Sequence, residues 1–208
     1  YTRAVAEALN VTEALGENIV VMGSSAGGLL ATWAAGQYPD RVDGAVFVSP
    51  FYDYAAGWVG PALNHRITTG LLLVVLGRDR YAGWEGYEDR PDLPGYEDHW
   101  LIHQESLAMV QLELLRRGIQ ASPGFPGNVS QPVLLLHYYK DDQTKDSVIS
   151  TKALVHTYDR FNGGAPHAQS RRVPIVEGNH ILTSAYVRAD QDAVLAALRS
   201  YFTDMFGP

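Results

Sequence analysis

The feature that most constrains the fold is the stretch 19–30 (IVVMGSSAGGLL), in which a β-branched apolar run ends in small residues. Residues 23–27, Gly-Ser-Ser-Ala-Gly, match the pattern G-x-S-x-G with Ser25 at the centre. The run before them predicts a buried strand, and the Ala- and Leu-rich segment 29–37 after them predicts a helix. A strand that turns sharply into a helix lifts the central serine to the tip of the turn, so Ser25 is the leading nucleophile candidate. Side chains at the flanking positions would collide with strand and helix, which predicts a need for both Gly23 and Gly27.

Four short apolar runs separated by helical patterns predict the fold class. The runs cover residues 18–22, 45–49, 132–137 and 173–177, and the helical patterns cover 29–37, 151–161 and 190–206. Each run is nearly continuous rather than alternating, as expected of parallel strands buried on both faces. An amphipathic helical pattern also opens the chain. This alternation predicts an α/β fold with a parallel sheet, and a length of 208 residues suffices for one sizeable core.

A different kind of sequence separates the second run from the third. Residues 51–129 are too long for a simple crossover and contain three of the four tryptophans, Trp58, Trp84 and Trp100. We expect an inserted cap over the strand ends, with residues 1–50 and 130–208 forming the core. The last cap helix is predicted over 99–117, with one apolar face made by Leu101, Leu107, Val110, Leu114 and Leu115.

Composition excludes several classes of function. The formal charge of −7 and the lack of a basic cluster beyond two arginine pairs argue against a nucleic-acid partner or an anionic membrane surface. The absence of cysteine excludes disulfides, zinc-thiolate sites and a thiol nucleophile. The longest apolar run, 71–76, is too short to span a bilayer, and the first residues show no signal-peptide pattern. We expect no cofactor and no integral membrane segment.

A serine nucleophile needs a base, and position singles out one of the seven histidines. His180 follows the last apolar run in a Gly-Asn loop, at the strand end where loops of open α/β sheets carry chemistry. His137 ends the third run, where we expect it to pack or to bond to backbone. His99 and His103 have i, i+4 spacing, which suits a metal, but without a third ligand nearby a structural or substrate-lining role is the better interpretation.

The acid that orients the histidine is expected just after the third run. Three carboxylates are available there, Asp141, Asp142 and Asp146. Asp141 and Asp142 lie closer to the strand, whereas Asp146 leads directly into a helix. We favour Asp146, with Asp142 second, and expect the others to be solvated loop carboxylates.

Taken together, these segments make the chain resemble the α/β-hydrolase superfamily, within it the monoacylglycerol lipase, lysophospholipase and serine aminopeptidase-like group. The resemblance is carried by GSSAGG, YPDRVDGAVFVSP, PVLLLH, DSVIS and VEGNHIL, at 23–28, 38–50, 132–137, 146–150 and 176–182. It implies a triad of Ser25, Asp146 and His180, with the backbone N–H of Ala26 as one oxyanion donor.

The sequence departs from this group in two places. The group's sheet begins with about four more strands, one of which is followed by the loop that supplies the second oxyanion donor. We therefore expect an upstream segment, on the same gene product or as a partner chain, to supply the remaining strands. The second departure is the long loop 141–146, which leaves the identity of the acid open.

Three functions follow as hypotheses. The first is an esterase or lipase acting on a small-molecule ester, since the apolar cap (Trp58, 71–76, Trp84, Trp100) suits an acyl chain or aromatic ester. The second is an aminopeptidase-type amidase, in which the cap acids would hold a substrate amine; these are Glu85, Glu88, Asp89, Asp92, Glu97 and Asp98. The third is a non-catalytic hydrolase-fold binding protein, which would have no need of a serine, a histidine and an acid in this order.

Overall fold

The centre of the molecule is a four-stranded parallel sheet. The computed structural model describes residues 1–81, 95–99, 101 and 103–207, and orders the strands β1-β2-β5-β6. Their bounds are β1 (Val20–Ser24), β2 (Gly44–Val48), β5 (Val133–Tyr138) and β6 (Arg171–Ile175). All four predicted runs are strands, each within two residues of its expected ends, and the prediction of a parallel-sheet α/β fold is confirmed.

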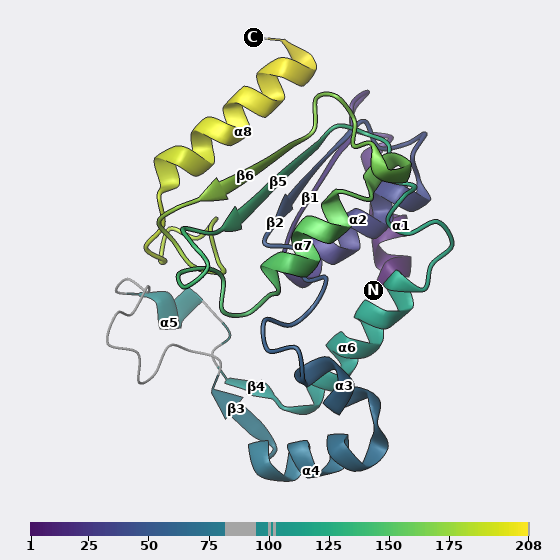
Figure 1. The fold of residues 1–208 in the computed structure, drawn as a ribbon. Helices are drawn as coiled ribbons and strands as arrows, with labels where there is room; N and C mark the ends of the chain where they lie inside the picture. Colours follow the sequence, from purple (N-terminus) through teal and green to yellow (C-terminus); the bar gives the residue numbers. More distant parts are fainter. Residues whose placement is uncertain (82–94, 100, 102, 208) are drawn as a thin grey trace.

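Helices cover both faces of this sheet (Figure 1). One face packs against α1 (Thr2–Thr12), α2 (Ala26–Gln37) and α7 (Thr151–Tyr158), and the other against α8 (Gln191–Phe206). Side chains alternate along a strand, so neighbouring residues of β5 enter different cores: Leu135 faces α2 and α7, whereas Leu134 faces α8. The predicted helix 151–161 ends earlier, at Tyr158, and a short 3-10 helix, η1 (Phe161–Gly164), follows it.

The strands differ in burial, which corrects the expectation that all four are covered on both faces. Every residue of β2 is buried, and β5 is buried up to its last residue. Along β1, however, Met22 is 52% exposed, and β6 alternates between covered and exposed residues. Among the described residues, α8 is the helix that packs on the second face, and it contacts β5, β6 and, through Tyr201, Ala45 of β2.

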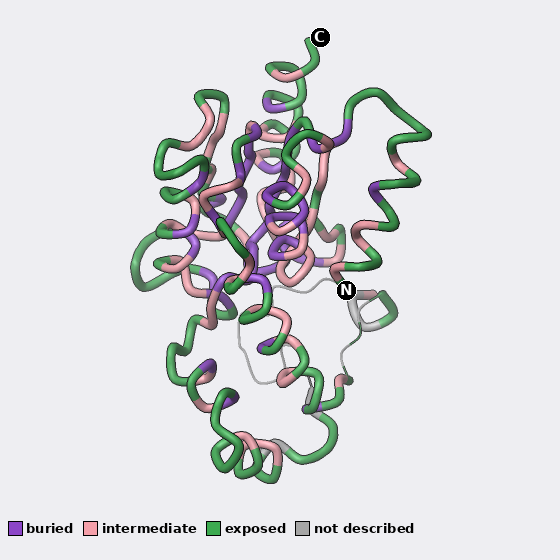
Figure 2. Tube along the Cα trace, turned by 90° about the vertical axis from the view of Figure 1, so that its right-hand side faces the viewer, coloured by how far each residue is buried: buried purple, intermediate pink, exposed green. Residues whose placement is uncertain are grey.

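The segment between β2 and β5 lies beyond the carboxyl ends of the strands (Figure 1). It contains α3 (Val59–Asn64), α4 (Arg66–Leu76), β3 (Asp79–Tyr81), α5 (Tyr96–His99), β4 (His103–Glu105) and α6 (Leu107–Gln120). Much of it is exposed, in contrast to the buried sheet (Figure 2). The boundaries of a cap at residues 51 and 129 remain a prediction.

The helix predicted over 99–117 is wrong in its first turns. Residues 103–105 instead form β4, which pairs antiparallel with β3, and α6 begins only at Leu107. The expected apolar face is wrong in part, because Leu101, Leu107 and Leu114 are all more than half exposed, whereas Leu115 packs on the core as predicted. The side of α6 that packs on the core carries Leu112, Leu115 and Ile119.

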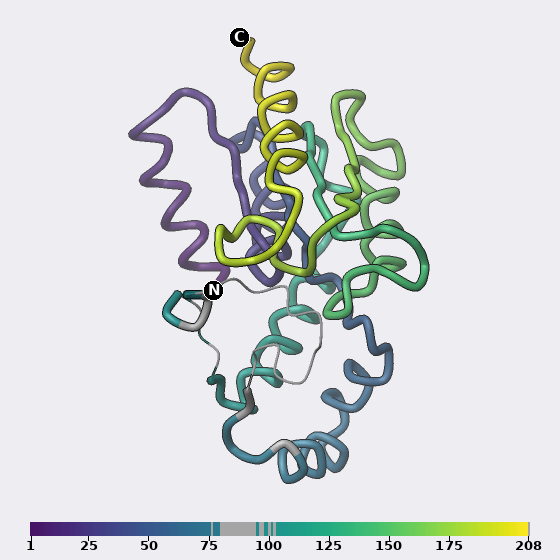
Figure 3. The backbone as a smooth tube through the Cα atoms, turned by 90° about the vertical axis from the view of Figure 1, so that its left-hand side faces the viewer, coloured from purple at the N-terminus to yellow at the C-terminus, as the bar shows by residue number. Residues whose placement is uncertain are grey.

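The two chain ends lie far apart. The N-terminus is close to the junction between the sheet and the segment 51–129, whereas α8 runs away from that junction to the C-terminus (Figure 3). Over the described ranges, no helix has both the length and the apolar character needed to cross a membrane.

Candidate active site

Ser25 occupies a strained turn between β1 and α2. Its backbone has φ 54° and ψ −119°, a conformation that a residue with a side chain rarely adopts. Three backbone hydrogen bonds hold this turn: the Ser25 N–H donates to the Val48 carbonyl at 2.9 Å, and the Ser25 carbonyl accepts from Phe51 at 3.0 Å and Leu29 at 3.1 Å. The Ser25 side chain is therefore fixed at the carboxyl end of β1, as the G-x-S-x-G pattern predicts.

The glycines beside Ser25 differ in what they allow. A Cβ on Gly23 would lie 2.1 Å from the Gly27 carbonyl oxygen, and a Cβ on Gly28 would lie 2.9 Å from Pro50. A Cβ on Gly27 would meet nothing within 4 Å among the described residues. The expectation that both flanking positions require glycine is thus correct for Gly23 and wrong for Gly27, and it is Gly28 that packs closely against the chain after β2.

The structure brings Ser25, His180 and Asp146 together in one hydrogen-bonded row. His180 Nε2 lies 2.8 Å from Ser25 Oγ, and His180 Nδ1 lies 2.8 Å from Asp146 Oδ2. His180 and Asp146 are buried, at 8% and 3% exposure. A serine hydroxyl is activated by this geometry, in which a base lies within hydrogen-bonding distance of the hydroxyl and an acid orients the base.

The Asp146 carboxylate is held on both of its oxygens. While Oδ2 faces His180, Oδ1 accepts the backbone N–H groups of Val148 at 2.8 Å and Ile149 at 3.1 Å. The two alternatives lie elsewhere: Asp141 closes its own turn by accepting from Gln143 and Thr144, and exposed Asp142 pairs with Tyr139 and Lys145. Of the three carboxylates, Asp146 is the one that lies within hydrogen-bonding distance of His180.

A small apolar cluster supports the loop of His180. Ile181 and Val187 are buried there, partly buried Tyr186 packs against them, and Asn179 accepts the N–H of Ile181 at 2.7 Å. His99 stacks on Tyr186 with the ring centroids 4.2 Å apart, so it has a structural contact. His99 ends α5 and His103 begins β4, so the i, i+4 pair does not share a helix. In the described part of the chain, no three potential ligands gather into a metal site.

His137 lies inside the protein, near Asp146 but outside the row. Its side chain is 1% exposed, and its Nδ1 has no hydrogen-bond partner among the described residues. Burial, with a smaller contribution from the positive charge of Arg172, lowers the pKa of His137 to about 4. His137 is therefore neutral near pH 7 and, as expected, packs at the end of β5.

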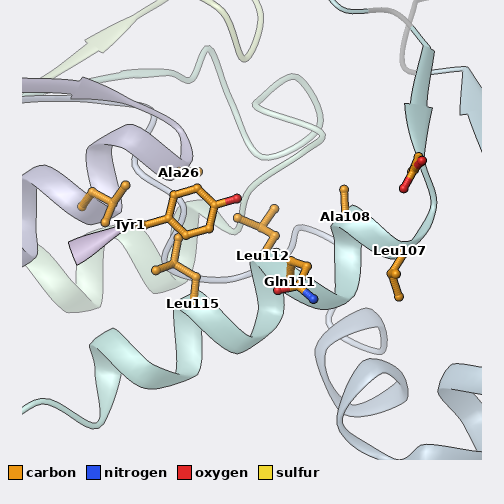
Figure 4. A pocket seen from close by; sticks show the side chains of 9 residues that line it. Tyr1, Ala26, Leu107, Ala108, Gln111, Leu112 and Leu115 are labelled. Carbon is orange, nitrogen blue, oxygen red and sulfur yellow. The ribbon is translucent and has the colours of Figure 1, made fainter. Parts of the chain in front are cut away.

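A pocket adjoins the serine turn between α2 and α6. Its volume is about 310 Å³, and its walls are mainly apolar side chains from the two helices (Figure 4). They belong to Leu30, Leu107, Ala108, Leu112 and Leu115, with Tyr1, Ala26, Glu105 and Gln111 completing the lining. Ala26 is the first residue of α2, where backbone N–H groups have no acceptor within the helix. The residue that follows Ser25 thus lies at the edge of this pocket.

Among the described residues, the side chains that line this pocket are not the ones expected from the sequence of residues 51–129. Trp58 is 63% exposed, and Leu71, Val74 and Val75 on α4 are more than 60% exposed; none of them lines the pocket. Trp84 and Trp100 fall outside the described residues, as do Glu85, Glu88, Asp89 and Asp92, while Asp98 is exposed. On α6, the predicted apolar face already contained Leu107 and Leu115 of this lining, but it missed Ala108, Gln111 and Leu112.

Comparison with known proteins gives the same fold. A structure from work on the metagenome-derived lipolytic enzymes LipS and LipT is 17% identical over 96% of this chain and 70% of its own, with a TM-score of 0.60. The monoacylglycerol lipase of Paleococcus ferrophilus is 13% identical over 100% and 74%, with a TM-score of 0.62. Est1E from Butyrivibrio proteoclasticus, bound to ferulic acid, is 17% identical over 100% and 68%, with a TM-score of 0.56. No curated protein sequence matches significantly.

The family itself is given by a sequence model. The model described as serine aminopeptidase, S33, matches residues 2–164, which is well over half of the chain and includes the turn at Ser25 and the carboxylate Asp146. The chain therefore belongs to the serine aminopeptidase S33 family of α/β hydrolases.

Proposed function

We propose that the protein is a serine hydrolase that cleaves carboxylic esters through an acyl-enzyme on Ser25. The observation that carries the proposal is the row of two 2.8 Å contacts joining Ser25, His180 and Asp146. A protein that only bound its ligand would need neither this row nor the strained backbone of Ser25, since such strain persists only where the surrounding structure holds it.

The first half of the reaction forms the acyl-enzyme. Ser25 Oγ attacks the ester carbonyl carbon while His180 Nε2 takes the hydroxyl proton, and the carbonyl oxygen becomes an oxyanion. Asp146 accepts the Nδ1–H of His180, which keeps Nε2 free to act as the base and stabilises the imidazolium. The N–H of Ala26, at the positive end of α2, donates to the oxyanion. The intermediate then collapses, and His180 gives its proton to the departing alkoxide.

The second half releases the acid. Water attacks the acyl carbon of the ester on Ser25, and His180 takes the proton of that water. Collapse of the second intermediate breaks the bond to Ser25 Oγ, which recovers its proton from His180. The products are an alcohol and a carboxylic acid, and every proton passes through His180 Nε2.

The pocket beside Ala26 supports an apolar substrate. Its leucine-lined walls would bury an acyl chain or an aromatic ring by the hydrophobic effect, and about 310 Å³ is enough room for a modest group of this kind. The similar structures include a monoacylglycerol lipase and an esterase bound to ferulic acid. Together these favour a monoacylglycerol, a lysophospholipid or a similar acyl or aromatic ester.

An amidase of the aminopeptidase type is the second candidate. Glu105 lines the pocket and is exposed, so its carboxylate is available to hold a substrate amine. The matching family model also carries an aminopeptidase description. The same triad would serve, with His180 protonating an amine leaving group instead of an alcohol.

Paired substrates with a common reporter group test the proposal. We expect the protein to hydrolyse p-nitrophenyl acyl esters faster than p-nitroanilides of free amino acids, with all turnover lost in Ser25→Ala. The preferred acyl length should shorten in Leu112→Trp, which fills the pocket. Faster anilide turnover that depends on Glu105 would favour the aminopeptidase, and equal turnover by the protein and its Ser25→Ala variant would overturn the hydrolase proposal.

A further inference from the structure

The helix that lines the pocket, α6, also carries a buried ion pair. Arg116 Nε and Nη2 donate to the two carboxylate oxygens of Glu113, at 2.8 and 2.7 Å. The Glu113 side chain is 1% exposed and that of Arg116 is 11% exposed. Burying two charges costs desolvation energy that an apolar pair would not, so such a pair is poor evidence of a purely stabilising role. Two bonds to Glu113 do fix the plane of the guanidinium.

The remaining donors of Arg116 reach out of the helix to the chain that follows β2. Arg116 Nη1 donates to the Tyr52 carbonyl at 3.2 Å and to Gln120 at 3.1 Å, and it lies 3.5 Å from the Asp53 carboxylate. Gln120 donates to the same Tyr52 carbonyl at 2.6 Å. The hydrogen bond to Glu113 raises the pKa of Arg116, so its charge is retained. Segment 51–55 is thereby held against α6.

One end of segment 51–55 contacts the nucleophile. The Phe51 N–H donates to the Ser25 carbonyl at 3.0 Å, in the strained turn itself. The Tyr52 hydroxyl shares a hydrogen bond of 2.7 Å with Thr32, which also donates to the Gly28 carbonyl in the first turn of α2. A shift of this segment would therefore displace the turn that holds Ser25.

The other end contacts the loop of the acid. The Ser150 N–H donates to the Asp53 carbonyl at 2.9 Å, and the Ala55 N–H donates to the Val148 carbonyl at 3.0 Å. Tyr54 and Ile149 form an isolated bridge between these two hydrogen bonds. Val148 and Ile149 are the residues whose N–H groups hold Asp146 Oδ1. A single segment thus contacts both the serine turn and the loop that orients Asp146.

We propose that Arg116, oriented by Glu113, is a positioning residue of the active site: it fixes segment 51–55 against α6, and this segment aligns Asp146 and Ser25 with His180. The inference rests on the proposed function, because alignment matters only if the row performs chemistry. It also links the cap side to the triad, since α6 lines the pocket with Leu112 and Leu115 and holds segment 51–55 with Arg116.

The test compares Arg116→Lys with Arg117→Lys in the full protein. Lysine keeps the charge beside Glu113 but cannot bond both carboxylate oxygens, Tyr52 and Gln120 in one plane. Arg117 is the matched control: it lies next along α6, is exposed and donates to Asn64. We expect Arg116→Lys to lower kcat for a short ester about tenfold to a hundredfold, with KM little changed, because small misplacements slow chemistry. Arg117→Lys should match the native protein in both constants.

Further measurements distinguish a positioning role of Arg116 from a role in folding. They also distinguish failure of this inference from failure of the proposed function. The low-field NMR resonance of the His180 Nδ1 proton, which reports the bond to Asp146 without any turnover, should shift or broaden in Arg116→Lys and stay unchanged in Arg117→Lys. If Arg116→Lys does not fold, Glu113→Gln with Arg116→Met removes both charges and should show the same losses. Native kcat and a native resonance in either folded variant would overturn the inference. Failure of the native protein itself to react at Ser25 would instead count against the proposed function.

Discussion

Asp146 Oδ2 lies 2.8 Å from His180 Nδ1, while its other oxygen accepts two backbone N–H groups. This geometry predicts a loss of roughly four orders of magnitude in kcat for Asp146→Asn, because an amide can donate to the histidine and favour the wrong tautomer. Asp142→Asn is the matched control, since exposed Asp142 pairs only with Tyr139 and Lys145 among the described residues and should keep native kcat. Ester turnover at saturating substrate measures kcat of both variants. A larger loss of kcat in Asp142→Asn than in Asp146→Asn would show that Asp146 is not the acid.

The strained backbone of Ser25 predicts a stability difference between two inactive variants. Glycine adopts φ 54° without the steric cost that alanine meets, so Ser25→Gly should be more stable than Ser25→Ala by about 1 kcal/mol. Both variants lack the Ser25 hydroxyl and should be inactive. Urea unfolding of the two proteins measures the difference, and a Ser25→Ala variant as stable as Ser25→Gly would show that the turn is not strained.

The glycines around Ser25 predict opposite responses to the same substitution. Gly23→Ala places a methyl group 2.1 Å from the Gly27 carbonyl oxygen, which should cost about 3 kcal/mol or more and distort the turn. Gly27→Ala meets open space in a helix and should be neutral or stabilising by up to about 1 kcal/mol. Thermal unfolding of both variants, with ester turnover, provides the comparison. Equal destabilisation by the two changes would contradict the packing described for this turn.

His137 predicts a pH dependence of folding stability. Burial lowers the pKa of His137 from 6.5 to about 4, so between these values the unfolded chain binds a proton that the folded protein does not. The stability due to neutral His137 is therefore complete above pH 6.5 and is lost as the pH falls toward 4, by at most about 3 kcal/mol. Nearby Asp146 and Arg172 act on this pKa in opposite directions.

The variant that tests this is His137→Gln, which cannot titrate. Urea unfolding between pH 7 and pH 4 should show a weaker loss of stability than in the native protein, whereas His65→Gln, at an exposed position between β2 and β5, should follow the native curve. The same slope in His137→Gln and the native protein would rule out His137 as the source of the dependence.

Much of the fold could be predicted from the sequence because its signals are local. Continuous apolar runs marked all four core strands, and the small residues around Ser25 marked the turn between β1 and α2. His180 could be chosen because the ends of parallel strands meet at one edge, so a loop after the last strand falls near Ser25. Asp146 was separable from Asp142 only by a weak preference, since three carboxylates in one loop have similar local patterns.

The segment between β2 and β5 was harder to predict for a physical reason. β3 and β4 are three-residue strands that pair with each other across a long separation, and a run such as His103–Glu105 carries no apolar alternation. Missing β4 led to a helix starting eight residues too early, and its predicted apolar face included Leu107 and Leu115 but not Leu112 among the leucines that line the pocket. The Glu113–Arg116 pair could not be recognised either, because a charge pair at i, i+3 looks the same in sequence whether it is exposed or buried.

The central claim is that Ser25 is a nucleophile activated by His180, and a fluorophosphonate probe tests it most directly. Mass spectrometry of the probe-treated full protein should find one adduct, located on Ser25, that is lost in Ser25→Ala and strongly reduced in His180→Ala. His156→Ala, which removes an exposed histidine of α7, should label like the native protein. Absence of an adduct on Ser25 in the folded native protein, or undiminished labelling in His180→Ala, would contradict the claim.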